Sequence, residues 1–314
     1  MPTLRGLLAA VLAAVLAALL LATVSPVVAA PHPAAAAPAL APGEDFPVLP
    51  ARCVDERGVP DGPCRVTRFP GRPTLVLWGD SHAQMYLPAV HAVASRQRVN
   101  LVVVVYGGCP TSLPFPRSAG HRRTGCDRHN VASLAAVRRI VRDRPRTRLL
   151  LGGFWSGYRL AHDLLRREER TGEPSGLTAY RAQMARLGVE RSAPMARAIA
   201  RLGVPVDVLA PAATVPLAPP PCAVGREPYR CDLPRAAALR DEAANRRWVR
   251  RHLLAPLPGR PRLVDPSPAY CDRRTCRATV RGVPTWYDDI HLGAALAATL
   301  QRFFRPVVRD LLRQ

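Results

Sequence analysis

The stretch 74-TLVLWGDSHAQMYLP-88 decides the fold of this chain. Residues Thr74 to Trp78 have the composition of a buried β-strand, and the residues after Ala83 have the pattern of a helix. The polar group Gly79-Asp80-Ser81-His82 therefore lies on the turn between a strand and a helix. Open α/β sheets keep their chemistry at such turns, beyond the carboxyl ends of the strands. This turn is the first candidate functional site.

Strand and helix patterns alternate along the rest of the chain, which is typical of an α/β fold with a parallel sheet. Further strands are expected at 99–106, 147–155, 204–211 and 262–267. Helices are expected at 131–143, 178–203, 235–254 and 292–312. The segment 158–178 is charged and mixed, and it is predicted to be an insertion or a lid rather than a separate domain.

The composition indicates one large globular domain with a basic surface. The chain has 314 residues, of which 48% are hydrophobic, so it can bury a full core. Its formal net charge of +22 comes from arginine alone, because the sequence contains no lysine. Aromatic residues make up only 5%, so no stacking platform accompanies the basic residues. We expect no nucleic-acid partner, and more attraction to anionic envelope polymers or phospholipid surfaces.

The N-terminus predicts export from the cytoplasm. Arg5 precedes an apolar run from Leu7 to Val28, which is followed by small residues. Residues 1–30 are therefore either a cleaved signal peptide or an uncleaved N-terminal anchor, since the run is long enough to span a bilayer. Residues 31–50 are predicted to be a Pro/Ala-rich linker and residues 51–314 the folded domain. The protein is expected to be secreted, or extracytoplasmic and anchored to the membrane.

Cysteine usage agrees with an oxidising compartment. None of the near-neighbour pairs has the two-residue spacing of a zinc knuckle, so disulfides are favoured over a metal site, and no cofactor is expected. Spacing alone does not exclude crossed pairs. The eight cysteines form the expected pairs Cys53 with Cys64, Cys109 with Cys126, Cys222 with Cys231, and Cys271 with Cys276.

A second polar motif, 286-WYDDIHLGAALA-297, precedes the last predicted helix. A parallel sheet gathers its carboxyl-end loops, so Asp288 and His291 can meet Ser81 in space. A serine hydroxyl needs an imidazole to take its proton, and the imidazole needs a carboxylate to set its tautomer. Asp289 is an alternative to Asp288 for the carboxylate role, but its closer position in the sequence gives it a less favourable angle toward the His291 ring. The pattern predicts a Ser-His-Asp triad.

The motifs resemble those of a known family. Gly79-Asp80-Ser81 together with Asp288-x-x-His291 is similar to the SGNH (GDSL-type) hydrolases. The segments 78-WGDSHAQMYLP-88, 264-VDPSPAYC-271 and 287-YDDIHLGAA-295 resemble the SGNH domains fused to membrane acyltransferase-3 domains in bacterial polysaccharide O-acetyltransferases. The resemblance extends from about Cys53 to the C-terminus. It implies a three-layer α/β fold with a doubly wound parallel sheet in flavodoxin-like strand order.

The resemblance also implies roles for individual residues. Ser81 matches the nucleophile, His291 and Asp288 match the rest of the triad, and the Ser81 N–H matches one donor of the oxyanion hole. Gly107 or Gly108 corresponds to the second donor. The third donor of the family is an asparagine in a Gly-x-Asn turn, whereas this chain reads 152-GGFWSGY-158. That departure leaves the side-chain donor unassigned.

Purely structural roles are the alternative explanation for these residues. Ser81 is also a common helix N-cap, as is Asp288, and His291 also suits a surface position in the last helix. Four further residues are candidates either for substrate binding or for packing, since flat apolar rings suit both sugars and cores. They are His82, Trp155, Tyr158 and Trp286.

The sequence predicts an extracytoplasmic serine acyltransferase or acylesterase. The resemblance implies that it acts on O-acyl groups, O-acetyl first among them, of a cell-envelope polysaccharide through an acyl-Ser81 intermediate. It also implies a separate membrane acyltransferase as the acyl donor for a transferase. The alternatives are a non-catalytic module that binds polysaccharide or cell wall, and a generic secreted lipase or esterase. The binding module predicts that the three residues do not converge, whereas both enzymes require that they do.

Overall fold

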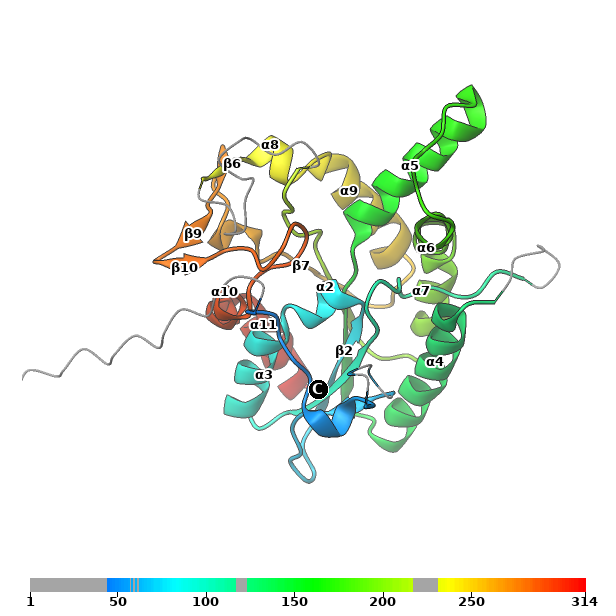
Figure 1. The fold of residues 1–314 in the computed structure, drawn as a ribbon. Coiled ribbons are helices and arrows are strands. Elements are labelled where there is room, and N and C mark those ends of the chain that lie inside the picture. The colour runs from blue at the N-terminus through cyan, green and yellow to red at the C-terminus, as the bar shows by residue number, and fades with distance from the viewer. Residues whose placement is uncertain (1–43, 57, 59, 61, 117–122, 217–230) are drawn as a thin grey trace, which may run out of the picture. The chain divides into compact units, whose positions relative to one another are not determined.

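The computed structural model describes residues 44–56, 58, 60, 62–116, 123–216 and 231–314. A six-stranded sheet in the order β1-β3-β2-β4-β5-β7 forms the centre of this domain (Figure 1). All neighbouring strands are parallel except β1, which is antiparallel to β3. The strands are β1 (Cys64–Arg65), β2 (Thr74–Gly79), β3 (Asn100–Val105), β4 (Thr147–Leu151), β5 (Val206–Leu209) and β7 (Leu263–Val264).

The order of the parallel strands confirms the flavodoxin-like arrangement. The first parallel strand in the chain, β2, lies between the second, β3, and the third, β4, and the fourth and fifth follow outward. Every residue of β2, β3, β4 and β5 is buried. Helices on both faces of a parallel sheet exclude water from both sides, which explains why these strands are continuously apolar instead of alternating.

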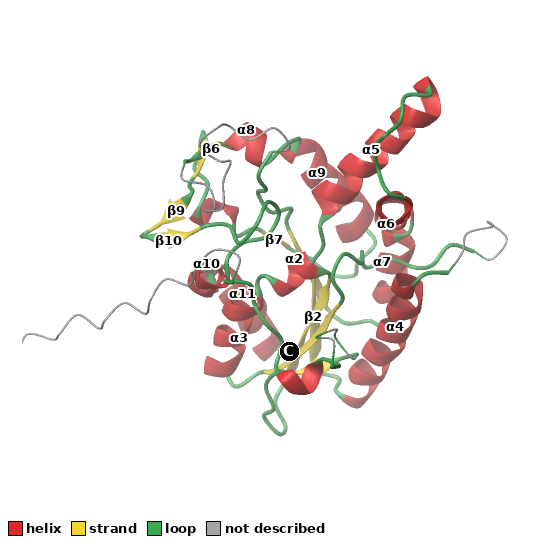
Figure 2. Cartoon of the chain, in the orientation of Figure 1, coloured by secondary structure: helices red, strands yellow, loops and turns green. Residues whose placement is uncertain are grey.

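Helices cover both faces of the sheet (Figure 2). Leu75 and Leu77 of β2 pack with the helices of one face, and Val76 and Trp78 pack with those of the other, because successive side chains of a strand point in opposite directions. The first face carries α3 (Leu87–Arg96), α10 (Ala294–Thr299) and α11 (Gln301–Leu312). The second carries α4 (Gly125–Asp143), α6 (Ala179–Glu190), α7 (Ser192–Ala200) and α9 (Glu242–Val249).

Several predicted elements differ from the observed ones. The segment predicted as an insertion or lid is mainly helix α5 (Trp155–Thr171), which ends at Gly172 with positive φ. Its buried Trp155 and Tyr158 pack in the same core cluster as the buried side chains of α6, so its charges form the outer face of an amphipathic helix. The expected long helices are each broken into shorter ones, for example at Arg191 between α6 and α7.

The remaining elements are short. After β5 come α8 (Arg235–Ala238), the π-helical turn η4 (Arg250–Leu254) and the 3-10 turn η5 (Ser267–Ala269). Two small antiparallel pairs of strands lie in the C-terminal part of the chain. They consist of β6 (Leu233–Pro234) with β8 (Thr275–Cys276), and β9 (Thr279–Val280) with β10 (Val283–Pro284).

Three disulfides join segments that are near in sequence. Cys53 in η1 (Ala51–Cys53) bonds to Cys64 in β1, Cys109 bonds to Cys126 at the start of α4, and Cys271 bonds to Cys276. These three expected pairs are confirmed, and crossed pairing among these six cysteines is ruled out. Cys222 of the fourth expected pair lies outside the described residues.

The predicted signal peptide or anchor, residues 1–30, lies outside the described residues. In the part of the chain that the structure describes, no helix is long and apolar enough to span a membrane. The end of the predicted linker differs from expectation. Asp45 and Leu49 are buried against the domain, so the folded unit includes at least residues 44–50. Pro/Ala-rich composition obscured this boundary, because buried contacts of a short extended segment leave no periodic pattern.

Candidate active site

Ser81 is the first residue of a one-turn helix, α2 (Ser81–Gln84), directly after β2. The N-cap of this helix is Asp80, whose Oδ1 accepts the His82 N–H at 2.8 Å. The expectation that Ser81 caps the helix is therefore wrong, and its side chain is available for another contact. As the first helical residue, Ser81 also has a backbone N–H without an intrahelical acceptor. The turn thus presents a hydroxyl and an amide donor together.

His291 is held in a loop between β10 and α10. The Asp288 carboxylate accepts the backbone N–H groups of Ile290 and His291 at 2.9 and 2.7 Å. The Tyr287 N–H donates to the His291 carbonyl at 2.9 Å. Asp288 thus closes a turn of its own loop and does not cap α10, whose N-cap is Gly293. The three-residue spacing folds the carboxylate back toward the imidazole that follows it.

The structure brings Ser81, His291 and Asp288 into one hydrogen-bonded chain. His291 Nε2 lies 2.7 Å from Ser81 Oγ. His291 Nδ1 lies 2.8 and 3.0 Å from the two carboxylate oxygens of Asp288. The predicted convergence is confirmed, and the imidazole is bonded to Asp288, as expected, instead of to its neighbour Asp289.

The electrostatics of Asp288 suit this arrangement. Burial opposes ionisation of the Asp288 carboxyl, but hydrogen bonds from the His291 ring and the Ile290 N–H outweigh it and lower its pKa. A charged carboxylate requires an N–H on the facing Nδ1 of His291. Nε2 is then the acceptor, and the Ser81 hydroxyl donates to it. This tautomer is the one in which an imidazole acts as a general base toward serine.

Asp80 connects the turn after β2 to the turn after β4. Its Oδ2 accepts the Phe154 N–H at 2.9 Å and the Tyr158 hydroxyl at 2.6 Å. The side chain is fully buried, and burial raises its pKa although these hydrogen bonds, with that of His82, act in the opposite direction. The motif analysis assigned Asp80 no role. The sequence did contain a signal for such a role, because Asp80 is a carboxylate between a buried strand and a serine.

His82 is buried next to the triad. It is 4% exposed and stacks on Phe154 with ring centroids 4.2 Å apart. Its ring centroid lies 5.0 Å from that of His291. Burial, with a smaller contribution from His291, lowers the pKa of His82 well below its usual value. Among the described residues its Nε2 has no hydrogen-bond partner. His82 is a neutral packing residue at the site rather than an exposed substrate contact.

The other three aromatic candidates are core residues. Trp155 and Trp286 are each 1% exposed and Tyr158 is 7% exposed. Trp286 donates its indole N–H to the Ala213 carbonyl at 3.2 Å. The idea that these rings form a sugar-binding face is therefore wrong, because none presents a face to solvent. An aromatic ring is equally suited to a protein core and to a sugar-binding surface, and only the packing around the ring shows which role it has.

The glycines expected in the oxyanion hole lie in the turn after β3. Gly107 and Gly108 are exposed, and Gly108 has φ +67°. The Tyr106 N–H donates to the Gly79 carbonyl at 3.1 Å, which holds this turn beside the end of β2. No asparagine occupies the turn after β4. There the Phe154 N–H is already bonded to Asp80, so that amide is not a third donor.

A small cleft lies next to Phe154 and Ile290, although none of the three triad residues lines it. It has a volume of about 110 Å³ and is lined in part by Phe154, Thr214, Leu239 and Ile290. Phe154 stacks on His82, and Ile290 precedes His291 in the chain. Phe154 is thus a site residue that the sequence analysis missed. Its position directly after a Gly-Gly turn at the end of β4 was the signal available for it.

The N-terminal segment also reaches the site. Phe46 packs edge-on against the His291 ring with centroids 5.1 Å apart. Asp45 accepts the Ala295 N–H and so caps α10. Both residues fall in the predicted linker, where composition hid them. Within the described residues, no group of three or more His, Cys, Asp or Glu side chains is placed to hold a metal ion.

The match to a protein-family model agrees with the motif analysis. Residues 52–306 match the family model of the SGNH domain (fused to AT3 domains). One similar solved structure is the periplasmic domain of a lipopolysaccharide acetyltransferase from Salmonella ser. Paratyphi A, at 11% identity, TM-score 0.47, with 76% of this chain and 84% of that chain covered. Another is a carbohydrate acetylesterase family member from Sinorhizobium meliloti, at 14% identity, TM-score 0.40, with 77% and 100% covered. No curated protein matches the chain by sequence.

Proposed function

The chain belongs to the family of SGNH domains found fused to AT3 domains, and from this premise we propose that it is an extracytoplasmic serine acyltransferase or acylesterase. Its substrates would be O-acyl groups, O-acetyl first among them, on a cell-envelope polysaccharide. The observation that carries the proposal is the 2.7 Å contact between Ser81 Oγ and His291 Nε2, with Asp288 on the other ring nitrogen. A non-catalytic binding module does not require these three side chains to converge.

The first half-reaction would form an acyl-enzyme. Ser81 Oγ attacks the acyl carbonyl carbon while its proton moves to His291 Nε2, and Asp288 stabilises the imidazolium. The developing oxyanion is bound by the Ser81 N–H and by the turn at Gly107 and Gly108. His291 then gives the proton to the departing alcohol oxygen. The donor's ester bond breaks as the Ser81 ester forms.

The second half-reaction decides between the two activities. An incoming hydroxyl gives its proton to His291 and attacks the acyl-Ser81 carbonyl, which releases the acyl group and restores the Ser81 hydroxyl. If the hydroxyl belongs to a sugar, the enzyme is a transferase, and if it belongs to water, the enzyme is an esterase. A transferase would take its acyl group from a separate membrane acyltransferase, as the family resemblance suggests.

One structural observation supports the compartment, whereas the short acyl group rests on the family resemblance. Three disulfides support a location outside the cytoplasm. The carbohydrate acceptor rests on the family resemblance.

The test is to trap the intermediate. The purified protein is incubated with a chromogenic acetyl ester, quenched in acid, and analysed by intact-mass and peptide mass spectrometry. We expect an adduct of one acetyl group on the peptide that contains Ser81, and none in Ser81→Ala. An acetyl group found only on other residues, with ester turnover intact in Ser81→Ala, would overturn the proposal.

Kinetics of the variants provide a second readout. Turnover in Ser81→Ala should fall on the order of a thousandfold or more, His291→Ala should fall about as far, and the double variant scarcely further, because the two residues act as a unit. Asp80 rather than Ser81 caps α2, so Ser81→Ala should change the free energy of unfolding by less than about 1 kcal/mol. If turnover survives both substitutions and only glycan retention weakens, the site is a binding module.

A further inference from the structure

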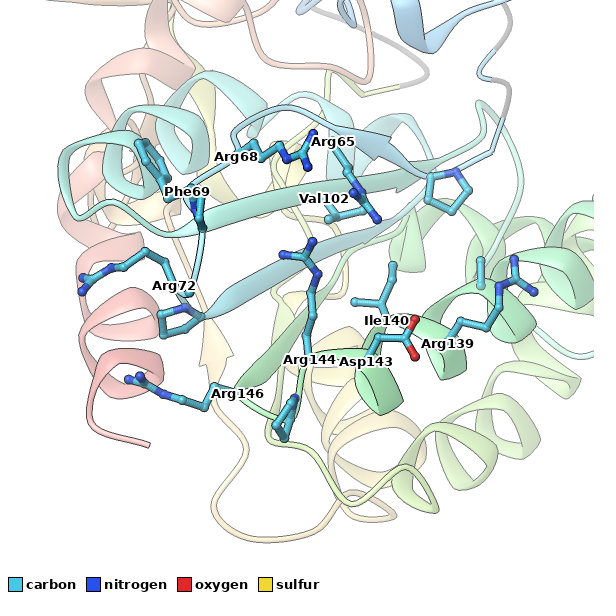
Figure 3. A pocket seen from close by; sticks show the side chains of 16 residues that line it. Arg65, Arg68, Phe69, Arg72, Val102, Arg139, Ile140, Asp143, Arg144 and Arg146 are labelled. Carbon is cyan, nitrogen blue, oxygen red and sulfur yellow. The ribbon is translucent and has the colours of Figure 1, made fainter.

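A second, strongly basic groove lies at the opposite edge of the sheet from Ser81. It is lined by the loop before β2, by the C-terminal part of α4 and by the loop before β4 (Figure 3). Its volume is about 800 Å³. Among the described residues that line it, Asp143 is the only acidic one, whereas six are arginines: Arg65, Arg68, Arg72, Arg139, Arg144 and Arg146. Ser81 follows the carboxyl end of β2, so this groove is separate from the triad.

Most of this charge is not neutralised within the domain. Arg72 donates to the carbonyls of Gln97 and Arg98, and Arg146 donates to the carbonyl of Leu312. Asp143 is paired with Arg142, its chain neighbour outside the groove lining. Among the described residues, the other four lining arginines have no carboxylate partner: Arg65, Arg68, Arg139 and Arg144.

Three of these arginines converge. Figure 3 shows the guanidinium groups of Arg65, Arg68 and Arg144 directed toward the same space over Val102. Arg72 and Arg146 extend away from it. Positive groups that face one another repel unless an anion lies between them. The convergence therefore favours a bound anion with several acceptor oxygens.

The backbone beneath these side chains is held by a buried amide. Asn100, 2% exposed, accepts the Phe69 N–H at 2.6 Å and donates to the carbonyls of Phe69 and Arg72 at 3.0 and 2.7 Å. These three bonds fix the loop that carries Arg68. A fixed loop lowers the entropy lost when the arginines bind a ligand. The backbone next to Arg68 is thus held in place at the edge of the groove.

We propose that this groove binds the phosphate groups of an anionic cell-envelope polymer. Guanidinium groups bind phosphate oxygens through paired, charge-assisted hydrogen bonds, and three of them suit phosphate groups repeated along a chain. A hollow of this size accommodates a polymer strand better than a flat bilayer surface. Phe69 is the only aromatic residue in the described part of the lining, which gives the groove no stacking platform for nucleic-acid bases there. The site would hold the polymer while the opposite edge of the domain carries the triad.

The test is binding of a labelled synthetic poly(glycerol phosphate) to the full chain. We compare the triple variant R65Q/R68Q/R144Q with a control, R128Q/R197Q/R273Q, which removes the same charge from exposed arginines elsewhere. We expect Kd to rise at least about 30-fold in the groove variant, since each lost charge-assisted contact contributes roughly three- to tenfold. The control should change Kd by less than about threefold, and the groove variant should depend less steeply on salt.

The outcomes separate this proposal from its rivals and from the catalytic one. Equal losses in both triple variants would assign binding to net charge and overturn the proposal. Groove-dependent binding of phosphatidylglycerol vesicles or of an oligonucleotide, without binding of the phosphate polymer, would overturn it as well. Thermal unfolding checks that both triple variants fold. If the groove variant does not fold, the single variant R68Q replaces it, and we expect R68Q to weaken binding about three- to tenfold. Acetyl-ester turnover should be unchanged in all variants, so this test is independent of the triad.

Discussion

At the scale of single residues, the two neighbours of Ser81 are both buried ionisable groups. Burial disfavours the charged form of each, so it raises the pKa of Asp80 and lowers the pKa of His82. Asp80 uses its oxygens to accept three hydrogen bonds. His82 uses its ring to stack on Phe154 beside the triad. The serine is thus fixed from both sides by side chains that leave the hydroxyl free to face His291.

The lowered pKa of His82 predicts a pH dependence of stability. Below about pH 6.5 the unfolded chain protonates this histidine, whereas the folded chain does not until a much lower pH. Stability should therefore fall as the pH drops below about 6.5. In His82→Phe, which keeps a stacked ring, Tm should fall less between pH 7.5 and pH 5 than in the wild type. His129, whose pKa is lowered to about 4, contributes equally to the pH dependence of both proteins. An equal fall in Tm for His82→Phe and the wild type would contradict the prediction.

At the scale of elements, the site depends on a close approach of two turns. A Cβ on Gly79, at the end of β2, would lie 2.0 Å from the carbonyl oxygen of Gly152 after β4. A Cβ on Gly152 would lie 2.7 Å from Cβ of Ala83 in α2. Only glycine allows α2 to sit this close to the turn after β4. The same contact brings Asp80 within reach of Phe154 and Tyr158.

Gly79→Ala should separate these two turns. The clash is with backbone, which cannot rotate away, so we expect a loss of about 1–3 kcal/mol in the free energy of unfolding and a fall in ester turnover. Gly107→Ala is the control for stability alone, because its new Cβ would meet nothing within 4 Å, and its free energy of unfolding should stay within about 0.5 kcal/mol. Urea unfolding measures both. Equal stability of the two variants would refute the account of the turn contact.

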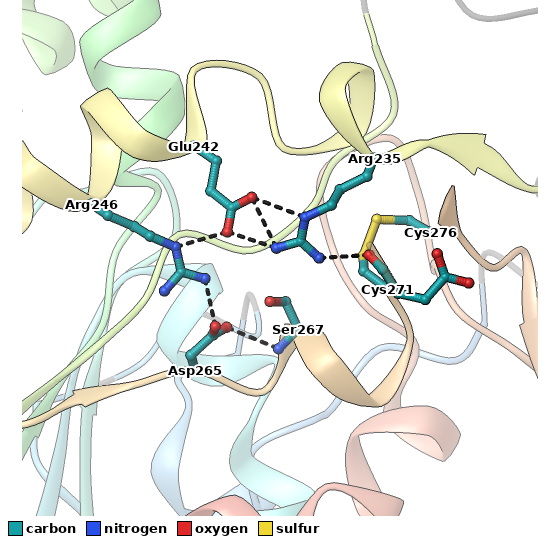
Figure 4. A network of polar contacts seen from close by, with 8 residues as sticks. Arg235, Glu242, Arg246, Asp265, Ser267, Cys271 and Cys276 are labelled. Atoms are coloured by element: carbon teal, nitrogen blue, oxygen red, sulfur yellow. Dashed lines mark hydrogen bonds and ion pairs between the residues drawn. A yellow bond between two sulfur atoms is a disulfide. The ribbon is translucent and has the colours of Figure 1, made fainter. Parts of the chain in front are cut away.

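Also at this scale, a half-buried ion network secures the region behind the small cleft (Figure 4). Glu242 of α9 accepts hydrogen bonds from Arg235 of α8 and Arg246 of α9. Arg246 also pairs with Asp265, which follows β7 and accepts the Ser267 N–H at 3.0 Å. Arg246 and Glu242 line the cleft, so the network joins α8 and α9 to the end of the sheet at that point.

At the scale of the whole molecule, disulfides close loops of different lengths, and one of these loops bears on the site. Cys109–Cys126, with a sequence separation of 17, ties the turn that carries Gly107 and Gly108 to α4. Cys271–Cys276, with a separation of 5, closes a short loop after η5. In the chain-entropy account, the longer loop stabilises the folded state more, because closing it removes more freedom from the unfolded chain.

Replacing each pair with alanine tests this ranking. Loss of Cys109–Cys126 should lower the free energy of unfolding by about 3 kcal/mol, and loss of Cys271–Cys276 by about 2 kcal/mol. Only the first should also lower acetyl-ester turnover, because it alone anchors the expected oxyanion turn. Urea unfolding and ester kinetics under oxidising conditions measure both effects. An unchanged turnover in the variant without Cys109–Cys126 would argue against a role for that turn.

Local signals in the sequence were sufficient for the βαβ order, the strand-turn-helix at Ser81, the Asp288-x-x-His291 turn and the near-neighbour disulfides. Each of these depends on residues a few positions apart, whose backbone preferences and spacing are already specific. Side-chain exposure is different, because it depends on which distant segments cover a residue. Only the tertiary structure could therefore bury Trp155, Tyr158 and Trp286, bring Phe46 onto His291, and gather Arg65 of β1, Arg68 of the loop before β2 and Arg144 of the loop before β4 into one groove.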